Sequence, residues 1–175
     1  MRTLMLLRHA KAVVADGKIR DHDRPLAPRG QKDAPKIGAY MGRHRLMPDC
    51  ALVSPAKRTR ETWALLAPAL ATPLQATFDA RLYDASPQTV MDVIQETGTA
   101  CPTLLVVGHN PALHRVAVGL IATGDLDARE QLHESLPTSG LVTIEFPFDD
   151  WRKLHAQAGR LGLFVTPDLL KAATD

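Results

Sequence analysis

The sequence predicts an α/β fold, a three-layer sandwich in which helices cover both faces of a mainly parallel central sheet. The first observation is that apolar runs of strand length alternate with longer segments of helical period along the chain. The second is that two runs, Thr3–Leu7 and Thr103–Val107, are continuously apolar, as strands covered on both faces are. The third is the length of 175 residues, of which 45% are hydrophobic, which suits one domain with a real core. We therefore expect a single domain over residues 1–175.

The strands of this sheet are expected where short apolar runs lie between turn residues. Four runs have this character: Thr3–Leu7, Ala51–Val53, Thr103–Val107 and Leu141–Phe146. Two weaker candidates are Leu74–Phe78 and Leu161–Val165.

The helices are expected between these runs. After Lys57 one face repeats apolar residues at Trp63, Leu66 and Leu70. Ser86-Pro87 and Asn110-Pro111 each resemble an N-cap followed by proline at the first helical position. The apolar faces that follow them are Val90, Val93, Ile94 and Thr97, and Leu113, Val116, Ala117, Leu120 and Ile121. Residues 29–43 are also expected to be helical, with a kink permitted by Pro35 and Gly38.

Composition narrows the class of protein. A formal net charge of +2 is too mild to indicate nucleic-acid binding. No apolar stretch approaches the length of a membrane span, and the first one stops at Arg8, too early for a signal peptide. We therefore expect a cytoplasmic protein without membrane or nucleic-acid partners. Cys50 and Cys101 lack a pairing motif and are expected to be reduced thiols. A monomer is compatible with the sequence, which does not fix the oligomeric state.

Chemically active residues follow three of the expected strands. Leu7 is followed by Arg8-His9, Val53 by Ser54-Pro55-Ala56-Lys57-Arg58, and Val107 by Gly108-His109-Asn110-Pro111. In open α/β sheets, ligands bind beyond the carboxyl ends of the strands. The last two segments also open helices, whose free N–H groups favour anions.

Each of these segments alone is commonly a solvated loop or a helix start. Together, at equivalent positions of one sheet, they gather two guanidinium groups and two imidazoles at one edge. The planar fork of arginine matches phosphate oxygens. The combination therefore predicts a site for a phosphate-sized anion.

The same residues resemble the histidine phosphatase superfamily. Leu6-Leu7-Arg8-His9-Ala10-Lys11-Ala12 is similar to its RHG-type signature, in the RHA form of the SixA-like branch. Asp21-His22-Asp23-Arg24-Pro25-Leu26 and Arg29-Gly30 are similar to the next segment of that branch. Residues 54–62 resemble the second-arginine motif, and residues 108–111 the second-histidine motif. The ordered set covers most of the chain and implies a phosphoglycerate-mutase-like fold.

The resemblance implies a role for each residue of the expected site. His9 would be the nucleophile that forms a covalent phosphohistidine. Arg8, Arg58 and His109 would hold the phosphoryl oxygens, with Asn110 in the same phosphate-binding set. No cofactor and no metal is implied, because the arginines supply the positive charge. The positive pocket should also favour the neutral form of the imidazole.

The general acid of larger family members has no certain counterpart here. Asp84 is the candidate in the segment after the third strand, although an acid there could simply open the next helix. Asp21 and Asp23 are rivals, because their loop could also reach the site. A phosphoramidate leaving group would need less protonation, so a fourth possibility is that no acid is required.

Three functions remain open at the level of sequence. A short chain leaves little room for a lid, so an open pocket would admit phosphohistidine in another protein, as in SixA-type phosphatases. The same chemistry could serve a small phosphorylated metabolite such as a sugar phosphate. A non-catalytic module that binds phosphorylated proteins is the third, although binding alone needs neither His9 nor His109.

Overall fold

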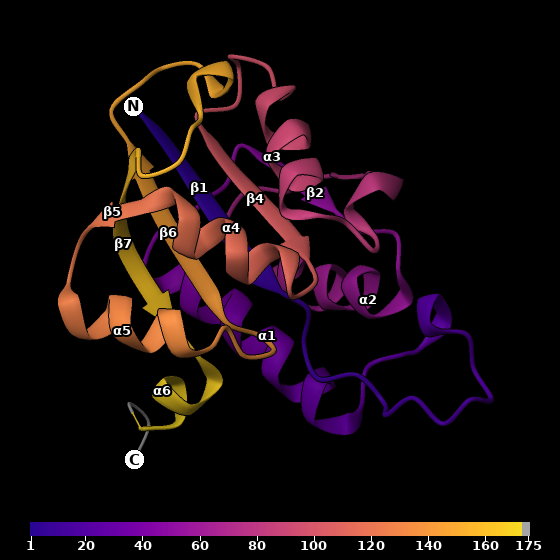
Figure 1. Ribbon diagram of the computed structural model, residues 1–175. Helices are drawn as coiled ribbons and strands as arrows, with labels where there is room; N and C mark the ends of the chain where they lie inside the picture. The colour runs from indigo at the N-terminus through magenta and orange to yellow at the C-terminus, as the bar shows by residue number, and fades with distance from the viewer. Residues whose placement is uncertain (173–175) are drawn as a thin grey trace.

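A seven-stranded sheet forms the centre of the computed structural model, which describes residues 1–172 (Figure 1). The order across the sheet is β3 (Ala76–Phe78), β2 (Cys50–Val53), β4 (Thr103–Gly108), β1 (Arg2–Arg8), β6 (Leu141–Phe146), β7 (Gly159–Val165) and β5 (Ile121–Thr123). Strand β6 runs antiparallel to its neighbours β1 and β7, while the other pairings are parallel. The expected mainly parallel sheet is confirmed.

Helices cover both faces of this sheet and make the three layers. The helices are α1 (Pro28–Arg43), α2 (Lys57–Leu66), α3 (Pro87–Gln95), α4 (Ala112–Leu120), α5 (Leu126–Glu134) and α6 (Pro167–Ala172). In Figure 1, α3, α4 and α5 lie in front of the sheet, and α1 and α2 lie behind it. Alternate residues of β1 divide the core accordingly. Leu4 and Leu6 face the cluster of α3, α4 and α5, and Met5 and Leu7 face that of α1 and α2.

The register of the three central strands aligns their carboxyl ends. Leu7 pairs with Val107, and Val107 pairs with Val53, so the last apolar residues of β1, β4 and β2 lie side by side. The residues that follow them must emerge at one edge of the sheet. This is the alignment that the sequence predicted for the anion site.

Local expectations were wrong at the ends of three helices. Leu70 lies beyond α2, which ends at Leu66, and Thr97 lies beyond α3, which ends at Gln95. Ile121 was expected to continue the helix before it, but it begins strand β5, which pairs with β7. Asn110 was expected to cap that helix, but α4 starts at Ala112 with Pro111 in the N-cap position and no side-chain cap. The Asn110 amide instead donates to the Leu136 carbonyl at 2.8 Å, a partner 26 residues away. Ser86, by contrast, caps α3 as expected by accepting from the Thr89 N–H.

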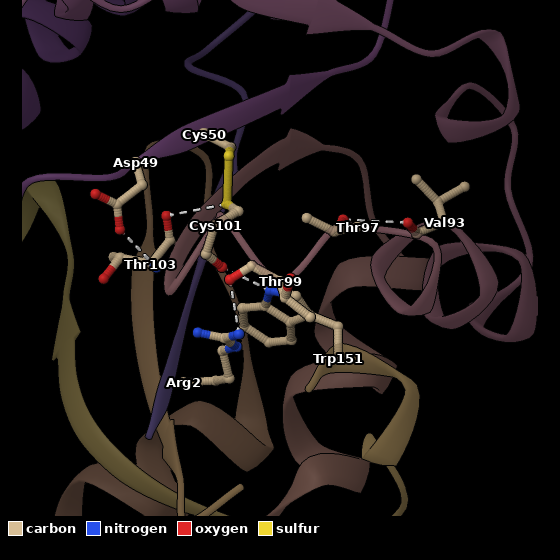
Figure 2. The surroundings of a disulfide bond; sticks show 9 residues. All are labelled: Arg2, Asp49, Cys50, Val93, Thr97, Thr99, Cys101, Thr103 and Trp151. Atoms are coloured by element: carbon tan, nitrogen blue, oxygen red, sulfur yellow. Dashed lines mark hydrogen bonds between the residues drawn. A yellow bond between two sulfur atoms is a disulfide. The ribbon is translucent and has the colours of Figure 1, made fainter. Parts of the chain in front are cut away.

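The cysteines correct a further expectation, because Cys50 and Cys101 form a disulfide rather than two reduced thiols (Figure 2). Cys50 begins β2, and Cys101 lies just before β4, so the parallel pairing of these strands brings their Cα atoms to 5.9 Å. Their separation of 51 positions along the chain hides this proximity in the sequence. The Trp151 indole donates to the Cys101 carbonyl at 2.7 Å and fixes the same segment.

The helices named above are shorter than the roughly 20 residues of a membrane-spanning helix. Within residues 1–172, none of them is long and apolar enough to cross a bilayer.

Candidate functional site

A cavity of about 390 Å³ opens at the carboxyl edge of β1, β2 and β4. Its walls are mostly polar and include every residue of the expected site: Arg8, His9, Arg58, Asp84, His109 and Asn110. The other lining residues are Lys11, Ala12, Asp21, Arg24, Tyr83 and Thr138. The structure therefore gathers in one place the side chains that the sequence separates by 102 positions between Arg8 and Asn110.

His9 is a buried imidazole with one nitrogen already engaged. It follows β1 directly, and its Nδ1 lies 2.7 Å from the Ala10 carbonyl oxygen. A carbonyl can only accept, so Nδ1 carries the proton and the Nε2 lone pair is free. Burial, with the charges of Arg58 and Arg8, lowers the pKa of His9 to about 4. The lowered pKa agrees with the sequence-based expectation, but burial is a larger cause than the positive pocket.

Arg8 and Arg58 supply the positive charge of the cavity. Arg8 donates to the Leu136 carbonyl at 3.1 Å, and Arg58 donates to the Asp21 backbone oxygen at 2.7 Å. Burial, together with the neighbouring charge of Arg58, lowers the pKa of Arg8. The Nε–H groups of both arginines are buried without a hydrogen-bond partner in the part of the chain described. Both guanidinium groups thus keep donor capacity beside the nucleophile candidate.

His109 faces His9 across the site, with ring centroids 5.3 Å apart. Its Nε2 lies 2.7 Å from the hydroxyl oxygen of the fully buried Ser54, while its Nδ1 is buried and has no partner among residues 1–172. Burial, followed by the charges of His9 and Arg58, lowers the pKa of His109 to about 3. Both imidazoles are therefore neutral near pH 7.

Asp21 belongs to the wall of the site because of a network that the sequence did not reveal. Its carboxylate accepts from the Tyr83 hydroxyl at 2.6 Å, from Arg24 at 3.0 Å and from Arg58 at 3.1 Å. These hydrogen bonds, that of Tyr83 first, hold the pKa of Asp21 well below its usual range. The network ties the Lys11–Leu26 loop, which projects from the body of the protein in Figure 1, to α2.

The three acid candidates differ in their surroundings. Asp21 is held ionised on Arg58, so it lacks the proton that a general acid must donate. Asp23 pairs with Arg20 at 2.8 Å and does not line the cavity. Asp84 lines the cavity and is exposed, in a left-handed backbone conformation with φ of 52°. Only Asp84 combines access to the cavity with freedom from such an ion pair in the described residues.

Two side chains of the site were missed by sequence reasoning. The sequence places Ser54 in the second-arginine motif but predicts no role for it, and it predicts none for Tyr83, the neighbour of Asp84. For Ser54 a signal existed, since it follows Val53 just as Arg8 follows Leu7 in the aligned strands. For Tyr83 there was none, because its partner Asp21 is 62 residues away.

Within residues 1–172 no group of three or more His, Cys, Asp and Glu side chains is placed to hold a metal ion. His22, which lies between two aspartates in the sequence, packs edge-on against the Tyr83 ring at 4.7 Å.

Comparison with known proteins agrees with this geometry. Residues 4–88 match the model of the histidine phosphatase superfamily, branch 1. An uncharacterized protein of Mycobacterium tuberculosis H37Rv is 40% identical over 143 residues, which cover 79% of this chain and 85% of that protein. A structure from Nakamurella multipartitia, assigned as the phosphohistidine phosphatase SixA, is 30% identical with a TM-score of 0.80. The match covers 95% of this chain and 96% of that one.

A second structure, from Agrobacterium tumefaciens and assigned to the same kind of phosphatase, is 28% identical with a TM-score of 0.77. That match covers 95% of this chain and 98% of the other. The chain belongs to the histidine phosphatase superfamily. Within it, sequence and fold place the chain in the SixA-type branch.

Proposed function

We propose that the protein is a phosphatase that removes the phosphoryl group from phosphohistidine in a partner protein, through a covalent intermediate on His9. The observation that carries this proposal is the state of His9. Its Nδ1 proton is committed to the Ala10 carbonyl, so Nε2 presents a lone pair beside two guanidinium groups. A site for binding alone would not need a nucleophile in this state.

The reaction has two steps on this geometry. In the first, His9 Nε2 attacks phosphorus, the bond to the substrate imidazole breaks, and that imidazole leaves with the electron pair and takes a proton from water. In the second, water attacks the phosphohistidine, which releases phosphate and restores His9. Arg8 and Arg58 stabilise the charge on the equatorial oxygens in both steps, because their positions are fixed before the substrate arrives.

His109 has a different task, which its hydrogen bond to Ser54 supports. The Ser54 hydroxyl oxygen accepts from the Ala56 N–H at 3.4 Å and is free to donate to His109 Nε2 at 2.7 Å. The imidazole proton then lies on Nδ1, which lacks a partner in the described residues. We assign this N–H to a phosphoryl oxygen and Ser54 to the positioning of the ring. Asn110, whose amide is held by Leu136, keeps its expected place in the phosphate-binding set.

Asp21 acts on Arg58 rather than on the leaving group. Its carboxylate occupies one side of the guanidinium, and its backbone oxygen occupies another. The Lys11–Leu26 loop, which carries Asp21, thereby fixes the orientation of the buried guanidinium and of its unpartnered Nε–H. Asp84 remains the candidate acid for substrates that need one.

The substrate class rests on the branch and on the leaving group. The structures at 28% and 30% identity are assigned as phosphohistidine phosphatases. Imidazole departs more readily than an alkoxide, which fits a site whose acid candidate is exposed and unpaired. We also propose that the chemistry needs no metal, since the arginines supply the charge. Activity should survive exhaustive chelation; loss with EDTA that magnesium or zinc restores would overturn this part.

We further propose that the protein works in the cytoplasm. The disulfide removes the reduced thiols on which this expectation partly rested. Thiol labelling in intact cells measures the state of Cys50 and Cys101. Protection of both cysteines from labelling would show that the disulfide persists in the cell, and recovery of the protein outside the cytoplasmic fraction would overturn the proposal.

The test of the proposed function is to trap the intermediate. A phosphorylated histidine phosphotransfer domain carrying radioactive phosphate is mixed with the protein and quenched in alkali. We expect a label on this protein, measured apart from the substrate domain, that is stable in alkali and lost in acid. The variant His9→Ala should show neither label nor turnover. Normal turnover by His9→Ala would remove His9 from its assigned role.

A further inference from the structure

A second hollow lies beside the phosphate cavity and shares two of its lining residues. It has a volume of about 340 Å³, and Lys11 and Thr138 line both spaces. The two hollows therefore adjoin at these side chains. The catalytic residues do not line the second hollow, and the steps described above make no use of it.

The wall between the hollows is a rigid part of the site. Segment 135–139 separates them, and its Leu136 carbonyl accepts from both Arg8 and Asn110. The Ser139 N–H contacts the carbonyl oxygens of Arg8 and His9 at 3.1 Å. A ligand in the second hollow would thus be held in a fixed relation to the nucleophile.

Lys11 is fixed at the boundary by its backbone. Its carbonyl accepts from the Ala27 N–H at 2.8 Å, and it packs directly on Gly30 in the first turn of α1. A Cβ at position 30 would collide with the Lys11 carbonyl oxygen, so this approach requires glycine. This contact gives the Arg29-Gly30 motif a physical role, which is to bring α1 against the segment that follows β1 and carries His9.

The charges in the second hollow leave one cation uncompensated. Arg29 lies 3.4 Å from the buried carboxylate of Asp33 and 3.7 Å from Asp168, whose side chain is 85% exposed. Within residues 1–172 the Lys11 ammonium forms no ion pair. The remaining lining is mixed, with the buried Phe164 and two prolines beside hydroxyl groups. Such a surface suits a peptide segment, which offers both apolar side chains and hydrogen-bonding groups.

We propose that this second hollow is a substrate-recognition site for the chain segment next to the phosphohistidine, and that Lys11 selects an acidic side chain in that segment. The proposal rests on the proposed function, because it places the rest of the substrate relative to the phosphoryl group in the first cavity. Lys11 is a specificity-determining residue in this assignment.

The experiment compares phosphohistidine peptides that differ at one flanking position. A glutamate is scanned through the positions on either side of the phosphohistidine, with alanine peptides as reference, and kcat/KM is measured for each. We expect the wild-type protein to prefer one glutamate peptide by about fivefold, the scale of one solvent-accessible ion pair, mainly through KM. High salt should reduce that preference.

Variants connect the preference to Lys11. Lys11→Met should bring the ratio between glutamate and alanine peptides to about one, and Lys11→Glu should favour a lysine at the same position. Lys32→Met is the matched control, since Lys32 is exposed on α1 and lines neither hollow, and it should keep the wild-type ratio.

Two outcomes overturn the inference separately from the function. Equal hydrolysis of all peptides by the wild-type protein, or an unchanged ratio in Lys11→Met, would refute the recognition site and leave the phosphatase intact. Hydrolysis of the phosphotransfer domain but of none of the peptides would refute the recognition site alone, and hydrolysis of neither would refute both.

Discussion

At their amino ends, strands β2 and β4 are joined by the Cys50–Cys101 disulfide. Polar groups of the chain around the disulfide are engaged in hydrogen bonds. Thr103 donates to Asp49, Trp151 donates to Cys101, and Arg2 donates to the Thr99 carbonyl (Figure 2). At the carboxyl ends of the same strands, polar groups are buried without partners. Of the six such side-chain atoms in residues 1–172, five lie at or beside the site: Arg8 Nε, Arg58 Nε, His109 Nδ1, Asn110 Oδ1 and Ser139 Oγ. The sixth is Arg2 Nε.

An unpartnered buried polar atom costs free energy in the folded state. Concentrating such atoms at one end of a sheet leaves that end able to gain interactions when a ligand arrives. The opposite end, closed by a disulfide and hydrogen bonds, contributes to stability alone. Substitutions at the two ends should therefore have different effects. Those at the amino end should change stability, and those at the carboxyl end should change catalysis.

The largest expected effect on stability lies at the amino end. The double variant Cys50→Ala, Cys101→Ala frees a loop of 51 residues in the unfolded chain. The unfolding free energy should fall by about 4 kcal/mol on the chain-entropy model, which lowers Tm by about 10 °C. Calorimetry measures the change, and dithiothreitol on the wild-type protein is the control. Turnover at 25 °C should stay within about twofold; a parallel loss of turnover would show that the two ends are coupled.

The corresponding change at the carboxyl end removes a guanidinium. Arg58→Met or Arg8→Met should each lower kcat/KM by about 10²–10³-fold, the scale for one preorganised charge stabiliser. Tm should fall less than in the cysteine variant, because each change removes a buried charge with an unpartnered Nε–H along with its hydrogen bonds to Leu136 or to Asp21. Arg160→Met, which loses only an exposed pair with Glu145, is the matched control and should leave turnover intact. An Arg58 variant that is active but unstable would reverse the roles assigned to the two ends.

The site can also be distinguished by its response to acid. The pKa values of His9 and His109 are lowered to about 4 and about 3, below the ordinary 6.5. Between pH 6.5 and 4 the unfolded imidazoles therefore bind protons that the folded ones do not, so stability falls as pH falls. Each imidazole should contribute a loss of up to about 3 kcal/mol by pH 4.

Urea unfolding at several pH values measures this loss. His9→Gln should reduce the slope of unfolding free energy against pH in that range by up to about 1.4 kcal/mol per unit. An identical slope in wild type and His9→Gln would mean that His9 is already charged in the folded protein.

The sequence predicted the carboxyl end of the sheet far better than the amino end. Arg8 ends β1, His109 follows β4 directly, and Arg58 lies in the first turn of the helix after β2. Parallel strands deliver such residues to one edge whatever their separation along the chain. The site thus follows from local patterns plus one rule of topology. Cys50 and Cys101 obey no comparable rule, because their approach depends on which two strands are neighbours.

The other features that the sequence did not predict have the same physical origin. Tyr83 reaches Asp21, and Asn110 reaches Leu136, through side chains whose partners are set by tertiary packing. Asn110-Pro111 carries the local signal of a helix cap, but the Asn110 side chain hydrogen-bonds to the distant Leu136 carbonyl instead. Ile121 fits a helical period, but pairing with β7 makes it a strand. Local propensity is overridden where a long-range partner is available.

The smallest expected effect concerns Asp84, and it tests whether the site is built for an easy leaving group. Asp84 adopts φ of 52°, a conformation that asparagine tolerates well, so Asp84→Asn removes the carboxyl with little change to the backbone. On phosphohistidine in a phosphotransfer domain we expect kcat/KM to change by less than about threefold, far below the ~10²–10⁴-fold of general acid catalysis. p-Nitrophenyl phosphate should respond as weakly, since its leaving group departs without a proton. An alkyl phosphate should lose ~10²-fold or more if Asp84 is the acid.

The wild-type protein should also hydrolyse phosphohistidine faster than any common sugar phosphate. A preference for one sugar phosphate, with a large effect of Asp84→Asn on its hydrolysis, would replace the phosphohistidine assignment with that of a small-molecule phosphatase. Tight binding of a phosphorylated protein without turnover would instead identify a binding module.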